Sequence, residues 1–301
     1  MASPEMTATK EAVLEARRAG QGAPPPTVEE MRAGMEVMLA ALPPVTGVST
    51  EAAQCAGLPA EWTVPAGTDT VGTILYFHGG GYFQGSIATH RRLVAALCLA
   101  GGTRGLSVGY RLAPEHRFPA AVDDAVAAYR WLISDGGEEP DRVIIAGDSA
   151  GGGLTFATLI ALRDAGDPMP AGGFGISPWT DLAGTGKSLV TRKDQDPFID
   201  PGGVDETAIR YAGDADRRNP LVSPLYGDLH GLPPLLIHVG GAEVLYDDAA
   251  RMADAARSAG VEVEFADWPD AFHVWHMMVG MIPEADEAVA AAGAWIAKRV
   301  G

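Results

Sequence analysis

Residues 142–151 read RVIIAGDSAG. The first five are almost all apolar, as expected for a strand that is buried on both faces of a sheet. The last five match the pattern G-x-S-x-G, and small residues then begin a helical segment over 150–165. Glycine on both sides of the serine allows a tight strand-to-helix turn, which lifts the hydroxyl above the sheet at a helix N-terminus. We therefore predict that Ser149 is a nucleophile, with a glycine-rich turn and a solvent-facing serine as the simpler alternative.

Strands and helices alternate along the chain on both sides of this segment. We expect strands at 60–65, 73–77, 105–110, 142–146, 173–177, 235–239 and 261–265. We expect helices at 8–19, 28–42, 88–100, 119–134, 150–165, 247–259 and 284–299. This alternation indicates an α/β protein with a mostly parallel central sheet and helices on both of its faces.

Two regions fall outside this alternation. Before the first core strand, Met31, Met35 and Met38 recur at helical spacing and share one helix face, where they could form a lid. From 183 to about 232 the chain is rich in Pro, Gly, Asp and Arg, which indicates an insertion carried by the sheet, with a helix near 203–212. We therefore divide the chain into an N-terminal helical cap segment (1–45), a first core part (46–182), a cap insertion (183–220) and a second core part (221–301).

The composition argues against several classes of protein. The 22 Lys and Arg residues face 39 Asp and Glu residues, giving a formal charge of −17, whereas nucleic-acid binding needs a basic face. The two cysteines, Cys55 and Cys98, have neither disulfide-framework nor zinc-site spacing, and no cofactor is implied. The sequence shows no secretory signal pattern and no run of 18 or more apolar residues, so we expect a cytoplasmic protein without a membrane partner.

The sequence HGGG at 78–81 directly follows the expected strand at 73–77. Successive glycines let the backbone approach a ligand and direct N–H groups toward it. Acyl transfer needs such donors, because its tetrahedral intermediate carries a negative charge on the former carbonyl oxygen. We predict an oxyanion hole formed by the N–H groups of Gly79, Gly80 and Ala150. The last glycine of the loop would shape it, and its histidine would brace it.

A serine hydroxyl also needs a base that removes its proton. His273 follows the expected strand at 261–265 after a short loop, close to the C-terminus. The chain order Ser, acid, His, which is typical of one class of catalytic triad, places the base there. We predict that His273 is the base, with His276 as the alternative.

The acid should follow a strand between the serine and this histidine. The expected strand at 235–239 leads to Glu243, Asp247 and Asp248. Both aspartates have a structural explanation as N-cap or first-turn acids of the helix at 247–259. Glu243 comes sooner after the strand, where an acid can reach the base, and we predict that it completes the triad, with Asp247 as the alternative.

Several motifs occur in an order that resembles the bacterial hormone-sensitive-lipase family of esterases over about residues 60–300. They are HGGGY at 78–82, YRLAPE at 110–115, FPAA at 118–121, GDSAGG at 147–152, DPF at 196–198, NPLVSP at 219–224 and GLPP at 231–234. The resemblance implies an α/β-hydrolase fold, a cap over the sheet and hydrolysis of short-chain acyl esters. The chain departs from the family at Glu243, where most members have Asp, and at Gly109, where Asp is usual.

These features together predict a serine carboxylesterase that works through an acyl-enzyme intermediate on a small-molecule ester. A lactone hydrolase or an amidase would use the same groups, and a ligand-binding protein that has lost catalysis is the alternative of another class. We expect no nucleic-acid or membrane partner, and a homodimer stays open. Tyr82, Phe83 and Met35 are the predicted substrate-binding residues, although simple packing of the cap would explain the methionines equally well.

Overall fold

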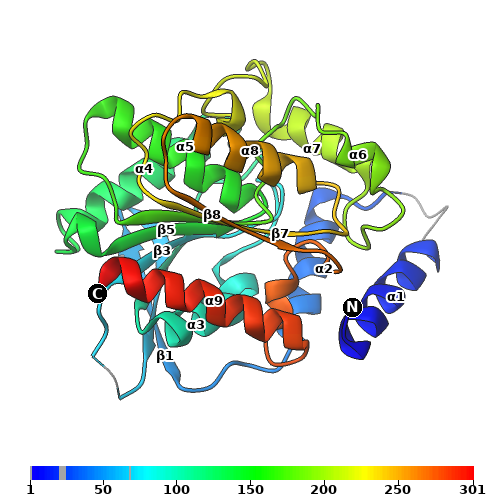
Figure 1. The fold of residues 1–301 in the computed structure, drawn as a ribbon, viewed down its shortest axis with the longest axis horizontal. Helices are drawn as coiled ribbons and strands as arrows, with labels where there is room; N and C mark the ends of the chain where they lie inside the picture. The colour runs from blue at the N-terminus through cyan, green and yellow to red at the C-terminus, as the bar shows by residue number, and fades with distance from the viewer. Residues whose placement is uncertain (1, 20–24, 68) are drawn as a thin grey trace.

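The structure is a computed structural model that describes residues 2–19, 25–67 and 69–301. Eight strands of this part of the chain form one sheet (Figure 1). Its order is β1-β2-β4-β3-β5-β6-β7-β8. The strands are β1 Val48–Cys55, β2 Leu58–Pro65, β3 Thr73–Phe77, β4 Arg104–Val108, β5 Val143–Asp148, β6 Gly172–Ile176, β7 Leu235–Gly240 and β8 Val263–Trp268. Strand β2 pairs antiparallel with β1 and β4, and the other neighbours pair in parallel. The predicted mostly parallel sheet is confirmed.

Helices cover both faces of the sheet, as the alternation of elements predicts. They are α1 Pro4–Ala19, α2 Val28–Ala40, α3 Ile87–Gly101, α4 Ala120–Ile133, α5 Ala150–Ala165, α6 Ser188–Thr191, α7 Pro201–Ala212, α8 Tyr246–Ser258 and α9 Pro283–Val300. Figure 1 shows α3 and α9 together on one face and α4, α5 and α8 on the other. The active-site elements described below lie at the carboxyl ends of the parallel strands.

Strand β3 shows how the sheet separates two hydrophobic cores. Its residues are all buried, and successive side chains of a strand point to opposite faces. Ile74 and Tyr76 accordingly pack with residues of α3 and α9, whereas Leu75 and Phe77 pack with residues of α4, α5 and α8. A strand covered on both faces needs no polar face, which explains its continuous apolar sequence.

The sequence pattern does not predict strand β1. Its sequence, VSTEAAQC, is mostly polar or small, and most of its residues are exposed or half-buried. It is an edge strand that is held by its antiparallel ladder with β2, so it lacks the apolar run that marks the central strands. The predicted bounds also shift at the other edge, where β8 covers Val263–Trp268 instead of 261–265.

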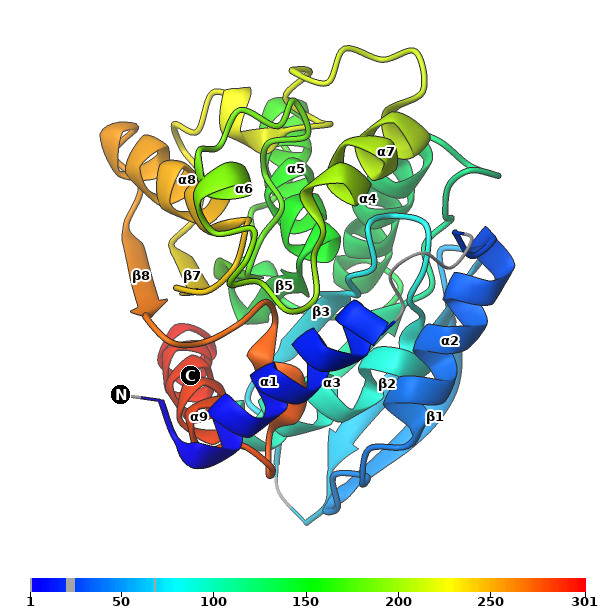
Figure 2. The same cartoon turned by 90° about the vertical axis from the view of Figure 1, so that its right-hand side faces the viewer.

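The N-terminal helix α1 links distant parts of the fold. Figure 2 shows it running from the neighbourhood of α9 toward α2. Near its start, the fully buried Met6 packs with Phe272 and Trp275. Near its end, the guanidinium of Arg17 donates to the backbone oxygen of Asp196 over 3.0 Å. Helix α1 therefore contacts both the C-terminal part of the core and the predicted insertion.

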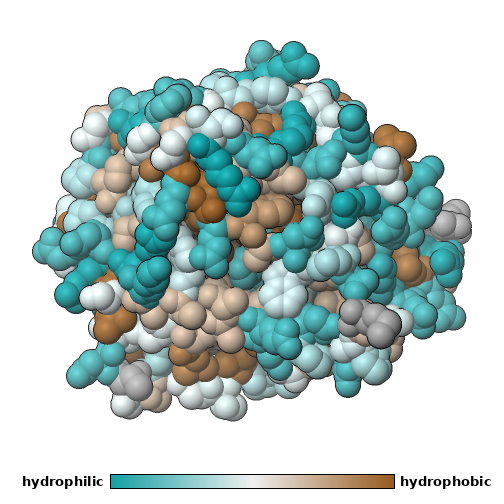
Figure 3. All heavy atoms as spheres, viewed as in Figure 1, coloured by the Kyte–Doolittle hydropathy of each residue, from teal (hydrophilic) through white to brown (hydrophobic). Residues whose placement is uncertain are grey.

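Polar residues dominate one face of the molecule. The face in Figure 3 is mostly hydrophilic, and apolar residues form only small patches on it. Among the residues that the structure describes, no helix has both the length and the apolar character needed to span a bilayer.

Candidate active site

Ser149 occupies a strained turn between β5 and α5. Its backbone has φ +53° and ψ −119°, a conformation that costs a non-glycine residue free energy and persists only where the surroundings fix it. Its N–H donates to the carbonyl oxygen of Ile176 over 2.8 Å. A Cβ atom at Gly147 would lie 2.3 Å from the Gly151 carbonyl oxygen, and one at Gly151 would lie 2.0 Å from that of Phe77. Both glycines of the predicted turn are therefore required by close backbone packing.

The predicted base and acid form a close pair. Nδ1 of His273 lies 2.5 Å from Oε2 of Glu243. The Glu243 side chain is completely buried, and its other oxygen, Oε1, accepts hydrogen bonds from the Gly240 N–H at 2.6 Å and the Ser177 hydroxyl at 2.9 Å. Burial opposes a charge on the imidazole, but the charge of Glu243 and its hydrogen bond outweigh burial and raise the pKa of His273 above 6.5.

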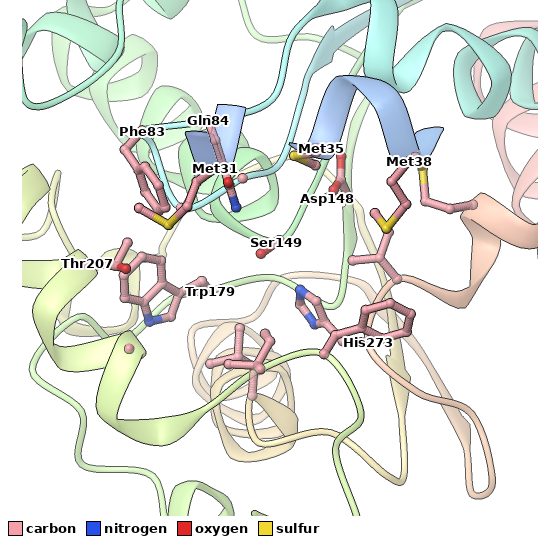
Figure 4. A pocket seen from close by; sticks show the side chains of 18 of the residues that line it. Met31, Met35, Met38, Phe83, Gln84, Asp148, Ser149, Trp179, Thr207 and His273 are labelled. Atoms are coloured by element: carbon pink, nitrogen blue, oxygen red, sulfur yellow. The ribbon is translucent and has the colours of Figure 1, made fainter. Parts of the chain in front are cut away.

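Ser149 and His273 line the same pocket, which has a volume of about 560 Å³. Figure 4 shows the serine hydroxyl and the imidazole both pointing into it. Both groups are therefore accessible from the same pocket. The structure thus brings together the residues predicted as nucleophile and base, with the predicted acid behind the imidazole.

The alternative base, His276, lies elsewhere. Its ring is completely buried, it does not line the pocket, and its Nε2 lies 3.0 Å from Nδ1 of His238, which sits in β7. Burial and the neighbouring His238 hold the pKa of His276 well below its usual value. His276 is therefore part of a buried histidine pair in the core.

The alternative acid, Asp247, is engaged by the insertion. One oxygen of its carboxylate accepts from the backbone N–H groups of Lys187 at 2.6 Å and Ser188 at 3.1 Å. Asp248 accepts in the same way from the N–H groups of Thr180 and Asp181. Both aspartates lie in the first turn of α8, as the sequence predicts. Their carboxylates also hold two parts of the chain, the segment after β6 and the start of α6.

The glycine loop differs from the prediction in one position. The Gly79 N–H donates to Oδ1 of Asp148 over 2.9 Å, so it is not free to bind an oxyanion. The N–H groups of Gly80, Gly81 and Ala150 have no acceptor among the described residues. Gly80 and Gly81 also line the pocket. The assignment of Gly79 as an oxyanion donor is wrong, and Gly81 has the free donor instead.

Asp148 is a neighbour of the proposed nucleophile whose role the sequence pattern does not predict. It is almost completely buried, and besides the Gly79 N–H its carboxylate accepts the Tyr76 hydroxyl at 2.8 Å and lies 3.2 Å from Nε2 of His90. Burial alone would raise its pKa, but His90 and the Tyr76 hydroxyl outweigh burial and lower it. A buried aspartate directly before the nucleophile was the available signal, although its partners lie far along the chain.

His78 braces the glycine loop, as its position predicts. Its ring stacks on that of Tyr110 with 4.4 Å between the ring centroids, and its Nδ1 lies 2.8 Å from the Gly79 carbonyl oxygen. Burial lowers the pKa of His78 to about 4. This histidine is therefore neutral near pH 7 and serves the conformation of the loop.

The pocket wall is mostly apolar and comes from both predicted cap segments. Figure 4 shows Met31, Met35 and Met38 of α2 along one side. The insertion and the loops opposite complete the wall with Phe198, Ile199, Val204, Thr207, Leu245 and Phe272. Of the predicted substrate-binding residues, Met35 and Phe83 line the pocket.

The third predicted substrate-binding residue, Tyr82, does not line it. Its ring is 1% exposed and stacks on the ring of Tyr211 in α7, with 3.7 Å between the centroids. The backbone of Tyr82 has φ +62°, in the left-handed region. Tyr82 therefore anchors the insertion to the core, and the prediction that it contacts substrate is wrong.

Enzymes that place a serine on such a turn, at the carboxyl edge of a mostly parallel sheet, form the class of α/β-hydrolases. The family described as having the alpha/beta hydrolase fold matches residues 74–277 of this chain. An acetyl-hydrolase from Streptomyces hygroscopicus is 51% identical over 242 residues, which cover 80% of each chain. An esterase from Acinetobacter venetianus is 36% identical over 218 residues, 72% of each chain.

Solved structures agree with these relatives. A crystal structure of an esterase from the bacterial hormone-sensitive lipase family superposes with a TM-score of 0.94, at 42% identity and with 100% of both chains covered. An esterase/lipase from an uncultured bacterium has a TM-score of 0.92 at 43% identity, covering 99% of both chains. The chain belongs to the bacterial hormone-sensitive-lipase family of esterases, as its motifs predict, and it is a serine carboxylesterase.

Proposed function

We propose that this enzyme hydrolyses short-chain carboxylic esters through an acyl-enzyme intermediate on Ser149, with His273 as the base and Glu243 as the triad acid. The observation that supports the proposal most strongly is the 2.5 Å contact between His273 Nδ1 and Glu243 Oε2 beside the pocket that Ser149 lines. A carboxylate at Nδ1 fixes the ring tautomer that leaves Nε2 free to take a proton, and it stabilises the imidazolium that then forms.

The reaction would proceed in two halves. Ser149 Oγ attacks the ester carbonyl carbon while Nε2 of His273 accepts the hydroxyl proton. The resulting oxyanion lies against the N–H groups of Gly80, Gly81 and Ala150. When the intermediate collapses, His273 returns the proton to the departing alcohol. The same imidazole then removes a proton from water, which attacks the acyl-enzyme, and His273 returns this proton to Ser149 Oγ as the C–Oγ bond breaks and the acid leaves.

The pocket supports a small, uncharged substrate. Its volume of about 560 Å³ lies in the range of small-molecule sites. The wall formed by Met35, Phe83 and the other apolar residues favours acyl and alcohol groups without charge, and thioether side chains adapt to different shapes. The described lining includes Asp148 and Asp200 but no lysine or arginine, which disfavours anionic substrates.

The test is a series of p-nitrophenyl esters from acetate to octanoate, assayed with the wild-type enzyme and with Ser149→Ala. We expect turnover that is highest for the short acyl chains and a loss of several orders of magnitude in kcat for the variant. Met35→Phe, which narrows the pocket, should move the preference further toward short chains if Met35 contacts substrate. A serine-independent hydrolysis, or a preference for lactones or amides in parallel assays, would contradict the proposal.

Two further expectations stay predictions. They are a possible homodimer and a cytoplasmic location. The wild-type enzyme in size-exclusion chromatography with light scattering would decide the first of them.

A further inference from the structure

A buried serine connects the two residues that we propose as triad acid and base. Ser177 follows β6 directly and is completely buried. Its hydroxyl donates to Oε1 of Glu243 over 2.9 Å and accepts from the Val274 N–H over 3.1 Å. Since Val274 is the residue after His273, one hydroxyl group holds both the acid and the loop that carries the base.

The backbone of Ser177 is held as firmly as its side chain. Its φ of +46° lies in the left-handed region, which a non-glycine residue rarely adopts. Its N–H donates to the carbonyl oxygen of His238 at the end of β7, over 2.7 Å. Val274 also has a positive φ, of +52°. Strained residues that the surrounding structure fixes tend to gather at functional sites, and here a hydrogen bond joins two of them.

We infer that Ser177 is a positioning residue, which orients the Glu243 carboxylate toward His273 and keeps the base loop in register with it. This inference rests on the proposed function. Ser177 does not line the pocket, so it acts through its neighbours and not on substrate. Oε1 of Glu243 accepts hydrogen bonds from two donors, the Ser177 hydroxyl and the Gly240 N–H. The other oxygen, Oε2, is then directed to the imidazole.

The first test compares Ser177→Ala with Ser177→Gly. Both remove the hydroxyl, but glycine adopts a positive φ without strain. We expect kcat to fall by roughly 10- to 100-fold in both, because a hydrogen bond to a charged group is lost, while KM changes by less than about twofold. If the residue matters only for its backbone conformation, Ser177→Gly would keep wild-type kcat, and the inference would be overturned.

Ser223→Ala is the matched control. Ser223 is also completely buried, and its hydroxyl also accepts from one N–H, that of Leu182, and donates to one oxygen, that of Arg217. It lies outside the pocket lining. This variant should lose thermal stability but keep kcat in its folded fraction. An equal loss of kcat in Ser223→Ala and Ser177→Ala would show a general effect of hydroxyl removal and would refute the inference.

A double-mutant cycle with Glu243→Ala separates positioning from a merely structural role. If Ser177 acts through Glu243, Ser177→Ala should lower the residual kcat of the Glu243→Ala enzyme by no more than a few fold, much less than it lowers the wild-type value. If Ser177→Ala lowered kcat as strongly in the Glu243→Ala enzyme as in the wild type, the inference would be overturned but the proposed function would stand. If ester hydrolysis by the enzyme did not depend on Ser149, both the inference and the proposed function would be refuted.

Discussion

The backbone N–H of Gly79 donates a hydrogen bond to the carboxylate of Asp148, the residue directly before Ser149, over 2.9 Å. The contact is tight, because a Cβ atom at Gly79 would lie 2.1 Å from Oδ2 of that carboxylate. This hydrogen bond therefore joins the glycine loop to the turn that carries Ser149. This contact directs the next two glycines, Gly80 and Gly81, toward the pocket that they line.

Replacement of Asp148 should impair catalysis according to how much of this contact survives. Asp148→Asn keeps one acceptor oxygen for the Gly79 N–H, so we expect kcat to stay within about tenfold of the wild-type value. Asp148→Ala leaves the Gly79 N–H with only the longer contact to Nε2 of His90, at 3.3 Å. It also leaves the buried Tyr76 hydroxyl without its carboxylate acceptor, which costs about 1–3 kcal/mol. We expect a fall of about 100-fold or more in kcat and a lower melting temperature, measured by steady-state kinetics and calorimetry. Equal activity of the two variants would argue against the role of this contact.

The two carboxylates that compete for the role of triad acid should respond very differently to neutral substitution. Glu243→Gln removes the charge that faces His273 and should lower kcat by about 10³- to 10⁴-fold. Asp247→Asn affects only the contacts with the N–H groups of Lys187 and Ser188 and should keep kcat within about threefold of wild type. Steady-state kinetics on p-nitrophenyl butyrate measures both. A larger loss of kcat in Asp247→Asn than in Glu243→Gln would indicate that Asp247 is the triad acid.

Much of the fold could be predicted because its signals are local. The apolar run before Ser149 and the glycines around it specify a buried strand and a tight turn, whatever the rest of the chain does. Strand β1 could not be found in this way, because it is a mostly polar edge strand whose position depends on its ladder with β2.

The details of the site depend on contacts between residues far apart in the sequence, which local patterns do not specify. Which glycine N–H faces the pocket depends on the hydrogen bond that the Gly79 N–H donates to Asp148. The side chain of Tyr82 turns away because Tyr211, in the insertion, stacks on it. The residues proposed as nucleophile, base and acid are easier to find in the sequence, because each lies at a fixed place in the order of strands and loops.

Activity should depend on pH through His273. The base must be neutral to accept a proton, and the adjacent Glu243 raises the pKa of His273 above 6.5 despite burial. Lowering the pH through this raised pKa protonates the imidazole, so kcat/KM should fall with a midpoint above pH 6.5. Glu243→Gln removes the raising charge and should move the midpoint to lower pH, whereas Asp247→Asn should leave it unchanged. A pH profile that is flat from pH 5 to 8 would contradict the role of His273.

Stability should also fall in mild acid, for a different reason. Burial lowers the pKa of His78 to about 4 and that of His238 to about 3, and it holds that of His276 well below 6.5. Below pH 6.5 the unfolded chain binds protons on these rings that the folded chain excludes. The free energy of unfolding should therefore decrease as the pH falls from about 6.5 toward these lower values. At pH 5 the loss is about 2 kcal/mol for each of His78 and His238.

Urea titrations at pH 7 and pH 5 test this dependence. The double variant His238→Asn with His276→Gln replaces the two rings by amides that can still pair, and it should lose less stability between the two pH values than the wild type does. His230→Gln is the matched control, because the His230 side chain is 74% exposed, and it should behave as the wild type. An unchanged pH dependence in the double variant would refute the assignment to the buried pair.

The most direct test of the central claim is covalent trapping of the nucleophile. Diethyl p-nitrophenyl phosphate reacts with activated serines, and intact-mass and peptide mass spectrometry locate the adduct. We predict one diethylphosphoryl group per chain on Ser149, together with a complete loss of esterase activity, and no adduct in Ser149→Ala under the same conditions. Inactivation by an adduct on another residue, or full activity in an enzyme labelled at Ser149, would contradict the account.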